Sequence, residues 1–261
     1  VPWDFAAHSE LISLSGDTLA AAIVDPGRIE VHDVAGLPAL EPWLAAQPAV
    51  GVALLLDDVR PRRGHPLAMA VAGPDGRTVA VEGPEASDAL RHVLERQRTP
   101  LVGHEVKPVL VAAFAEDGDA TPLPVAFDTQ IAAYILNAAL RSQSIADVVA
   151  ETLDQILPPA TDLTAAARAG LEALSVIALR EPLERRLVDG NLDRLFREVE
   201  LPLIPVLARM EAVGVALDLE ALAVLDREFA GEITRLEQEI YVDVGHEFNL
   251  GSPKQLEQIL F

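Results

Sequence analysis

Segments with strand character alternate with segments of helical character through the first half of the chain, and this alternation limits the possible folds most strongly. The aliphatic run at residues 50–56 predicts a buried strand. Turn signals at Asp25-Pro26-Gly27 and at residues 73–77 predict two hairpins, formed by residues 19–24 with 28–34 and by residues 66–72 with 78–81. Shorter strands are expected at 100–103 and 125–127. The pattern predicts an α/β domain with a mixed sheet up to about residue 188, followed by an all-helical segment.

Helices are expected between and after these strands. Prolines mark the expected irregularities, because a proline inside a helix removes one backbone hydrogen bond and clashes with the preceding turn. We therefore expect a break near Pro182 and interruptions at Pro202 and Pro205. The predicted helices are 40–46, 84–98, 107–115, 129–137, 144–153, 165–188 and 191–213.

Composition restricts the class of protein. The 261 residues include no cysteine, which excludes disulfides and thiolate metal sites. The first residues lack the basic and apolar regions of a signal peptide, and no apolar run has the roughly 18 residues of a membrane span. A cytoplasmic protein that does not contact membranes is expected.

The net charge argues against strong DNA binding by this chain alone. There are 20 Lys and Arg against 41 Asp and Glu, a formal net charge of −21. DNA-binding modules usually carry a basic face, since neutralising phosphates supplies much of their affinity. Local basic groups at residues 60–63 and at Arg185-Arg186 are typical of solvated surface.

The C-terminal stretch predicts two well-defined helices. Gly214 marks a hinge, Asp218 is placed to cap a long helix, and Gly245 is placed to end it. Ser252, followed by Pro253, predicts the start of a second helix, with Gln255 able to complete a capping box. One apolar stripe follows the long helix at spacings of three and four residues: Leu219, Leu222, Leu225, Phe229, Ile233, Leu236, Ile240 and Val244.

The same stretch resembles the start of the polymerase region in family A DNA polymerases, the bacterial DNA polymerase I group. The similarity covers about sixty residues, and the chain stops soon after the second helix begins. We therefore interpret the chain as a fragment that contains the base of the polymerase thumb. The matching residues are Glu200, Pro202, Leu203, Leu207, Gly214, Val215, Asp218, Phe248, Asn249, Ser252, Pro253, Lys254, Gln255, Leu256, Leu260 and Phe261.

A shorter segment resembles the 3′–5′ exonuclease domain that precedes the thumb in that family. Phe127-Asp128-Thr129 and residues 133–137 carry this similarity. It implies a ribonuclease H-like fold, a mixed sheet flanked by helices. We expect residues 1–188 to form a vestigial exonuclease-like domain and residues 189–261 to begin the polymerase domain.

The exonuclease chemistry of this family needs four carboxylates and a tyrosine, and the carboxylates hold two divalent ions. By register, Leu55 stands where the first Asp belongs, with Asp57 at the Glu position, and Val109 replaces the next Asp. The third motif fails because no Tyr lies between Tyr134 and Tyr241, and no Asp between Asp162 and Asp189. Apolar side chains cannot coordinate Mg²⁺, which requires oxygen ligands. The resemblance therefore predicts an inactive, architectural domain.

Residual site candidates have simpler structural explanations. Asp57 and Asp58 could hold a cation, but a solvated carboxylate pair between a strand and a loop is the preferred interpretation. Asp128 lies within a motif, yet it can also cap the following helix. His104 and Glu105 provide only two ligands and are typical of a surface turn.

The resemblance implies a role within a bacterial DNA polymerase I in replication and repair, with Mg²⁺ as the parent's cofactor and no cofactor in this fragment. The palm and fingers and primer-template DNA are the implied partners, with Asn249, Ser252 and Lys254 as candidate DNA contacts. Two alternatives stay open: an active Mg²⁺-dependent 3′–5′ exonuclease of the same fold, and an acidic protein-interaction module.

Overall fold

The computed structural model describes residues 25–260 apart from residues 117, 119–120 and 140–141. The chain divides into two compact units, Val1–Gly214 and Val215–Phe261. The predicted 19–24 strand lies outside the described residues. The predicted boundary between residues 188 and 189 concerns domain organisation in the parent polymerase, and it stays a prediction.

A six-stranded mixed sheet organises the described part of the first unit, in the order β1-β4-β3-β2-β5-β6. Its central strand, β2, pairs antiparallel with β3 on one side and parallel with β5 on the other. The β3–β4 hairpin is formed as predicted, whereas β1 joins the edge of the sheet parallel to β4. The strands are β1 (Ile29–Val31), β2 (Val50–Leu56), β3 (Pro66–Ala72), β4 (Thr78–Glu82), β5 (Leu101–Gly103) and β6 (Val125–Asp128).

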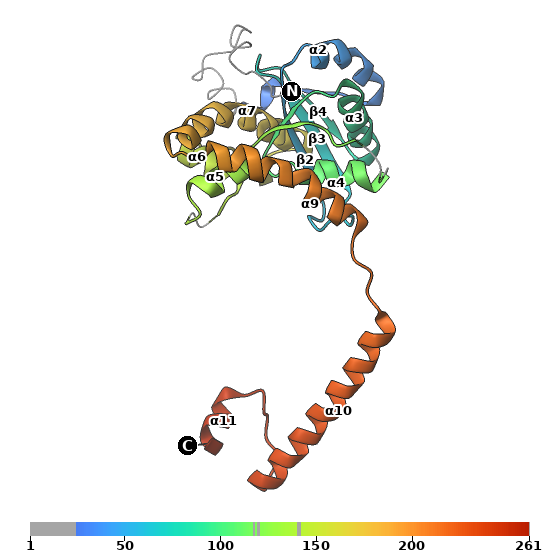
Figure 1. The fold of residues 1–261 in the computed structure, drawn as a ribbon, viewed down its shortest axis with the longest axis vertical. Coiled ribbons are helices and arrows are strands. Elements are labelled where there is room, and N and C mark those ends of the chain that lie inside the picture. Colours follow the sequence, from blue (N-terminus) through green and yellow to red (C-terminus); the bar gives the residue numbers. More distant parts are fainter. Residues whose placement is uncertain (1–24, 117, 119–120, 140–141, 261) are drawn as a thin grey trace. The chain divides into compact units, whose positions relative to one another are not determined.

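Helices cover both faces of the sheet (Figure 1). The long helix α7 (Ala165–Asp189) lies across β2, β3 and β4 on one face, together with α5 (Thr129–Leu136) and α6 (Ile145–Leu153). The other face is covered by α3 (Pro84–Gln97), α4 (Lys107–Glu116) and α9 (Leu201–Val213). Short elements complete this unit: η2 (Pro26–Arg28), η3 (Val34–Leu40), α2 (Glu41–Ala45) and η4 (Ala160–Asp162).

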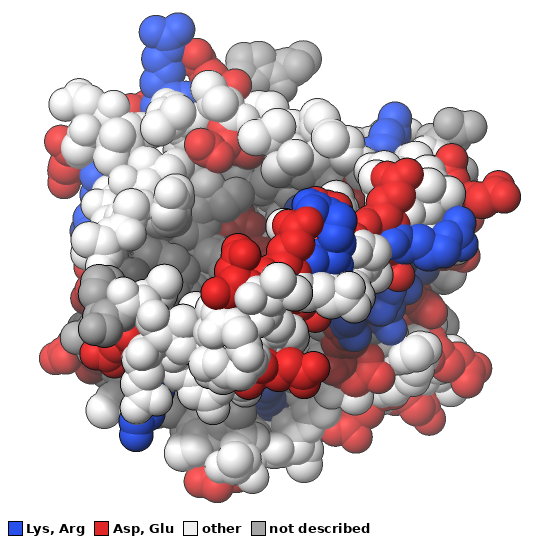
Figure 2. All heavy atoms as spheres, turned by 90° about the horizontal axis from the view of Figure 1, so that it is seen from below, with Lys and Arg blue, Asp and Glu red and all other residues white. Residues whose placement is uncertain are grey.

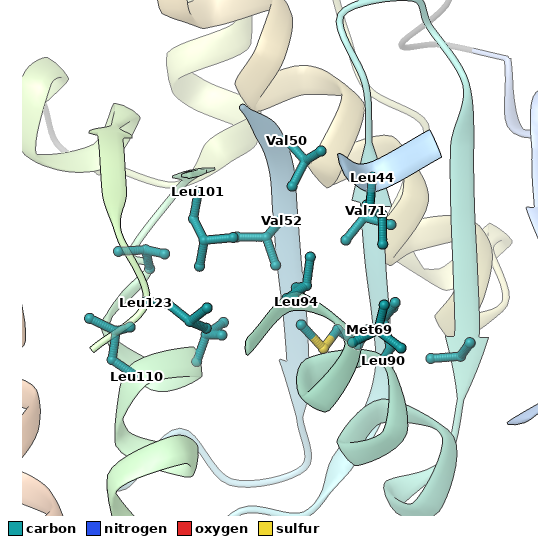
Figure 3. Packing of buried hydrophobic residues seen from close by; sticks show 14 of the residues in the cluster. Leu44, Val50, Val52, Met69, Val71, Leu90, Leu94, Leu101, Leu110 and Leu123 are labelled. Atoms are coloured by element: carbon teal, nitrogen blue, oxygen red, sulfur yellow. The ribbon is translucent and has the colours of Figure 1, made fainter. Parts of the chain in front are cut away.

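Strand β2 is buried on both faces because its side chains alternate between two hydrophobic clusters. Val50 and Val52 point toward α3 and α4, where they meet Met69, Leu90 and Leu101 (Figure 3). Ala53 and Leu55 belong to the cluster beneath α7. A strand covered on both sides needs apolar residues at every position, which explains the aliphatic run from residue 50 to residue 56.

Helix α7 continues through Pro182, so the predicted break there is wrong. Proline at this position removes one helical hydrogen bond. The helix is held on both sides of the proline by burial of Leu179, Leu183 and Leu187 against the sheet unit. Tertiary packing therefore outweighs the local cost.

The segment predicted as one interrupted helix over residues 191–213 contains three helical elements. Helix α8 (Asp193–Leu195) leads into η5 (Phe196–Glu200), a π-helical turn, which leads into α9. Pro202 lies in the first turn of α9, where a missing N–H costs little, whereas Pro205 lies inside this helix. The π turn falls directly before Pro202, and Phe196 within it is buried against Phe127, with 4.7 Å between ring centroids.

The second unit contains α10 (Leu219–Val244) and α11 (Pro253–Leu260). Asp218 caps α10 through bonds from the backbone N–H groups of Glu220 and Ala221, and Gly245 ends it with φ of 85°. Within this unit the apolar stripe of α10 is not covered, and Leu236 is 43% exposed. The Gln255 side chain accepts from the Asn249 N–H at 2.8 Å, so it does not close the predicted box onto Ser252. No helix in the described part of the chain is both long and apolar enough to cross a membrane.

Candidate nuclease-like site

The positions that sequence register assigns to metal-binding carboxylates are filled by packed apolar side chains. Leu55 is 9% exposed beneath α7, and Val109 on α4 is 2% exposed in the cluster on the opposite face of the sheet. Neither side chain can bind a cation. The structure therefore presents a hydrophobic core at two of the predicted ligand positions.

Helix α7 approaches β2 closely enough to exclude a ligand between them. A Cβ atom on Gly51 would lie 2.1 Å from the carbonyl oxygen of Ala173 and 2.8 Å from a side-chain carbon of Ile177. Only a glycine permits this approach, because any larger residue would collide with the helix backbone. Two ions and a nucleotide have no space at this contact.

A small cavity remains beside this contact. It measures about 40 Å³ and is lined by residues of β2, α4, α7 and the turn between β5 and α4, including Ala53, His104, Val109 and Glu172. Ligand pockets are typically about 300–1,000 Å³. The cavity is therefore too small for a nucleotide.

Asp57 and Asp58 lie in the loop that follows β2 and are engaged locally. Asp57 accepts bonds from the backbone N–H of His65 at 2.7 Å and from its ring at 3.4 Å. The His65 backbone bond is the main reason that the pKa of Asp57 lies below its usual value. Asp58 forms a two-pronged pair with Arg60, whose Nε lies 2.9 Å from each carboxylate oxygen. Both carboxylates thus shape the β2–β3 loop.

Asp128 acts as a buried structural cap. Its Oδ1 accepts from the N–H groups of Gln130, Ile131 and Glu105, at 3.0, 3.1 and 3.3 Å. Its Oδ2 accepts from the N–H of Val106 at 2.8 Å. The carboxylate therefore caps α5 and holds the β5–α4 turn, and its lone pairs are largely used by the backbone.

The sheet keeps Asp57 apart from Asp128. Asp128 pairs in register with Gly103, and Gly103 pairs with Val52. Asp128 is therefore two strands from β2, about 10 Å across the sheet, while Asp57 lies five residues beyond Val52, about 16 Å along the strand direction. One ion cannot contact both carboxylates at that separation.

The ring nitrogens of His104 are both used in hydrogen bonds, so His104 and Glu105 do not form a pair of metal ligands. The His104 ring lies between Thr129 Oγ1 at 2.9 Å and the carbonyl oxygen of Gln143 at 2.7 Å. Its Nε2 must donate, because a carbonyl oxygen only accepts. Burial lowers the pKa of His104, which favours the neutral ring. In the part of the chain that the structure describes, no group of three or more His, Cys, Asp or Glu is placed to hold a metal ion.

Two cations that sequence reasoning missed connect the β2–β3 loop and α4 to the end of α9. Arg62 Nη1 donates to the carbonyl oxygen of Ala212 at 2.9 Å, and Lys107 Nζ lies 2.6 Å from Glu211 Oε1. Arg62 has a positive φ of 62°, which is uncommon for a residue with a side chain. We call these two contacts the α9 clamp. No local pattern signals them, because the partners are 150 and 104 residues apart in sequence.

The three candidate DNA contacts lie together at the start of α11. Asn249 Oδ1 accepts from the Gly251 N–H at 2.9 Å, and Ser252 Oγ accepts from the Gln255 N–H at 3.4 Å. Lys254 is exposed in the first turn. The polar side chains of Asn249 and Ser252 thus already stabilise the local turn and the helix start.

The surface is predominantly acidic, as the composition requires. Figure 2 shows acidic side chains spread over the face that it draws, with basic side chains interleaved among them. Many of these are local pairs, such as Arg235 with Glu232 and Glu239 on α10.

The chain is similar to known polymerases over most of its length. It is 35% identical to the DNA polymerase I of Mycobacterium tuberculosis over 94% of this chain and 30% of that protein. The chain thus spans about a third of the curated relatives that it matches at this coverage. The structure also resembles the polymerase domain of Pol1 from M. smegmatis in complex with DNA primer-template and dNTP, with 29% identity and a TM-score of 0.74 over 90% of this chain and 40% of that one.

A second solved structure supports the fold alone. It is the apo form of a nuclease, 18% identical, with a TM-score of 0.56 over 72% of this chain and 94% of that one. No family model matches the chain. Together with the mixed sheet, these neighbours confirm the predicted ribonuclease H-like α/β fold.

Replacing Asp128 tests its role as a cap. Asp128→Ala leaves four backbone N–H groups without their acceptor, and we expect the free energy of unfolding to fall by about 2–4 kcal/mol. Asp57→Ala removes bonds to His65 alone, in an exposed loop, and is the matched control; it should lower the denaturation midpoint much less. Equal effects of the two substitutions in urea denaturation would contradict this assignment.

Proposed function

We propose that this chain, which is homologous to a part of bacterial DNA polymerase I, is the structural base from which a longer polymerase carries its thumb. In this proposal the sheet unit positions α9 and the hinge at Gly214, and the second unit begins the thumb. The longer polymerase would extend a primer with Mg²⁺ as its cofactor, in the cytoplasm and in contact with DNA.

The observation that carries this proposal is that α9 has two apolar faces. One face, with Ile204, Ala208 and Ala212, is buried in the sheet unit. The opposite face is apolar and exposed in this chain, through Val199 on η5 and Leu203, Val206 and Met210 on α9. A helix that is apolar all round is normally buried on all sides. We infer that the exposed face contacts the remainder of the polymerase.

The α9 clamp supports the same role. Arg62 and Lys107 hold the last turn of α9 just before the hinge at Gly214. The hinge residue has a φ of 74°, a backbone conformation that favours glycine. In this proposal the clamp holds the segment from which the thumb begins.

We propose further that the nuclease-like unit has no exonuclease activity. Packed Leu55 and Val109 and the cavity of only about 40 Å³ argue against a two-ion site. The residues present do not fit a pair of divalent ions, which needs several carboxylates around one small space.

A nuclease assay tests the inactive site. The purified chain, incubated with end-labelled single-stranded DNA and either Mg²⁺ or Mn²⁺, should release no nucleotides above a chelator control. Degradation that disappears in Asp57→Ala or in Asp128→Asn would overturn the proposal and favour an active exonuclease with unusual ligands. Degradation unchanged in both variants would indicate a contaminant.

A substitution on the exposed face of α9 tests the architectural role. Met210 is 63% exposed, so Met210→Asp should leave the melting temperature of this chain nearly unchanged. In the longer polymerase the same change would bury a charge, and we expect a loss of about 2 kcal/mol or more. Ile156→Asp, at an 86% exposed position, is the matched control and should be tolerated in both proteins.

The architectural proposal fails if Met210→Asp melts like the unsubstituted protein in the longer polymerase. It also fails if this substitution destabilises the isolated chain to the same extent. Thermal unfolding of the two proteins, followed side by side, separates these results.

We also propose that Asn249, Ser252 and Lys254 contact the backbone of primer-template DNA. Lys254→Ala in the longer polymerase should weaken DNA binding and reduce the slope of log affinity against log salt by about 1, since one phosphate contact is lost. Arg227→Ala, on exposed α10, is the control. An unchanged salt slope for Lys254→Ala in a fluorescence anisotropy titration would refute this contact.

A further inference from the structure

A second cavity lies on the face of β2 opposite α7. It is much larger than the cavity of about 40 Å³ described above. It measures about 330 Å³ and lies between the β2–β3 loop, α4 and the last turn of α9. This volume is within the range of small-molecule sites. Residues of the α9 clamp line it, but none of the functions proposed above places a ligand in it.

The walls of this cavity are largely apolar and held in place. Leu54 and Leu56 come from β2, and Val111, Ala112 and Ala115 come from α4. Pro61, Pro66 and Pro108 also line the space, and proline restricts the backbone. A preformed apolar wall favours the flat or aliphatic body of a small ligand.

The cations that line this cavity already have protein partners. Arg60 is paired with Asp58, Arg62 with the Ala212 carbonyl, and Lys107 with Glu211. An anionic ligand would have to replace these partners. Electrostatic complementarity to an anion is therefore poor.

A carboxylate at the edge of the cavity lacks such a partner. Among the described residues, no cation lies within ion-pair distance of the Glu105 carboxylate, and no side-chain hydrogen bond reaches it. Its backbone has a positive φ of 61°, a conformation in which few residues with side chains are found. Strained residues of this kind concentrate at binding and catalytic sites.

The surroundings of Glu105 favour protonation or a bound cation. The residue as a whole is exposed, but desolvation of its carboxylate is the main reason that its pKa is raised; the charges of Asp128 and Glu211 add to this effect, while Lys107 opposes it. Of the other carboxylates in the lining, Asp88 lies 3.5 Å from Arg91 and Glu211 lies 2.6 Å from Lys107. A ligand cation would therefore be bound by Glu105 itself.

We propose that this cavity binds a small organic cation, with an apolar body against β2 and α4 and a single amidinium or ammonium group at the Glu105 carboxylate. The apolar walls supply binding energy for the body of the ligand. The charge-assisted bond to Glu105 supplies selectivity for cations.

Three probes of nearly equal shape test this proposal on the 261-residue chain. Benzamidine is cationic, benzamide is neutral and benzoate is anionic, while the ring is shared. In methyl NMR titrations, benzamidine should shift the signals of Leu54, Leu56 and Val111 and bind at least tenfold more tightly than the other two probes. Benzoate binding as tightly as benzamidine, or the absence of shifts at these methyl groups, would overturn the proposal.

Substitution of the carboxylate provides the second measurement. Glu105→Gln should reduce benzamidine affinity at least tenfold and leave the weak binding of benzamide unchanged. Glu237→Gln, on exposed α10, is the matched control and should bind like the unsubstituted chain. Full benzamidine affinity in a folded Glu105→Gln variant would show that the cation is not recognised by this residue.

Discussion

The close approach of α7 to the central strand β2 is the contact on which the rest of the first unit depends. Gly51 permits it, since a Cβ atom there would collide with the Ala173 carbonyl. The contact belongs to one hydrophobic cluster across β2, β3 and β4, which also contains the leucines on both sides of Pro182 in α7. The same helix covers Leu55, one of the positions where the resemblance expects a carboxylate.

The second face of the sheet has a different role. There α3 and α4 cover β2, and α9 adds Ile204, Ala208 and Ala212 to the same cluster. The α9 clamp fixes the end of this helix, while its outer apolar face stays exposed in this chain. The proposed scaffold role and the proposed cation pocket both arise from this arrangement, because α4, α9 and the β2–β3 loop enclose the pocket.

The elements whose sequence signals lie within a few neighbouring residues were predicted correctly. The strand at residues 50–56, the β3–β4 hairpin and the Asp218 cap are all confirmed. Sequence reasoning failed at Pro182, where long-range burial outweighs the local preference of proline. It also could not choose between a cap and a ligand for Asp128, because the two N–H groups that decide the matter, those of Glu105 and Val106, come from a distant turn.

The sequence by itself determined the periodicity of the elements, the absence of cysteine chemistry, the net charge of −21 and the presence of Leu55 and Val109 at positions where the family resemblance expects carboxylates. Each of these is a property of residue identity and local spacing. Only the tertiary structure decided that α7 seals β2, that Arg62 and Lys107 hold α9, and that Glu105 borders a cavity of about 330 Å³. These features depend on groups that are far apart in the chain and are brought together when the sheet forms.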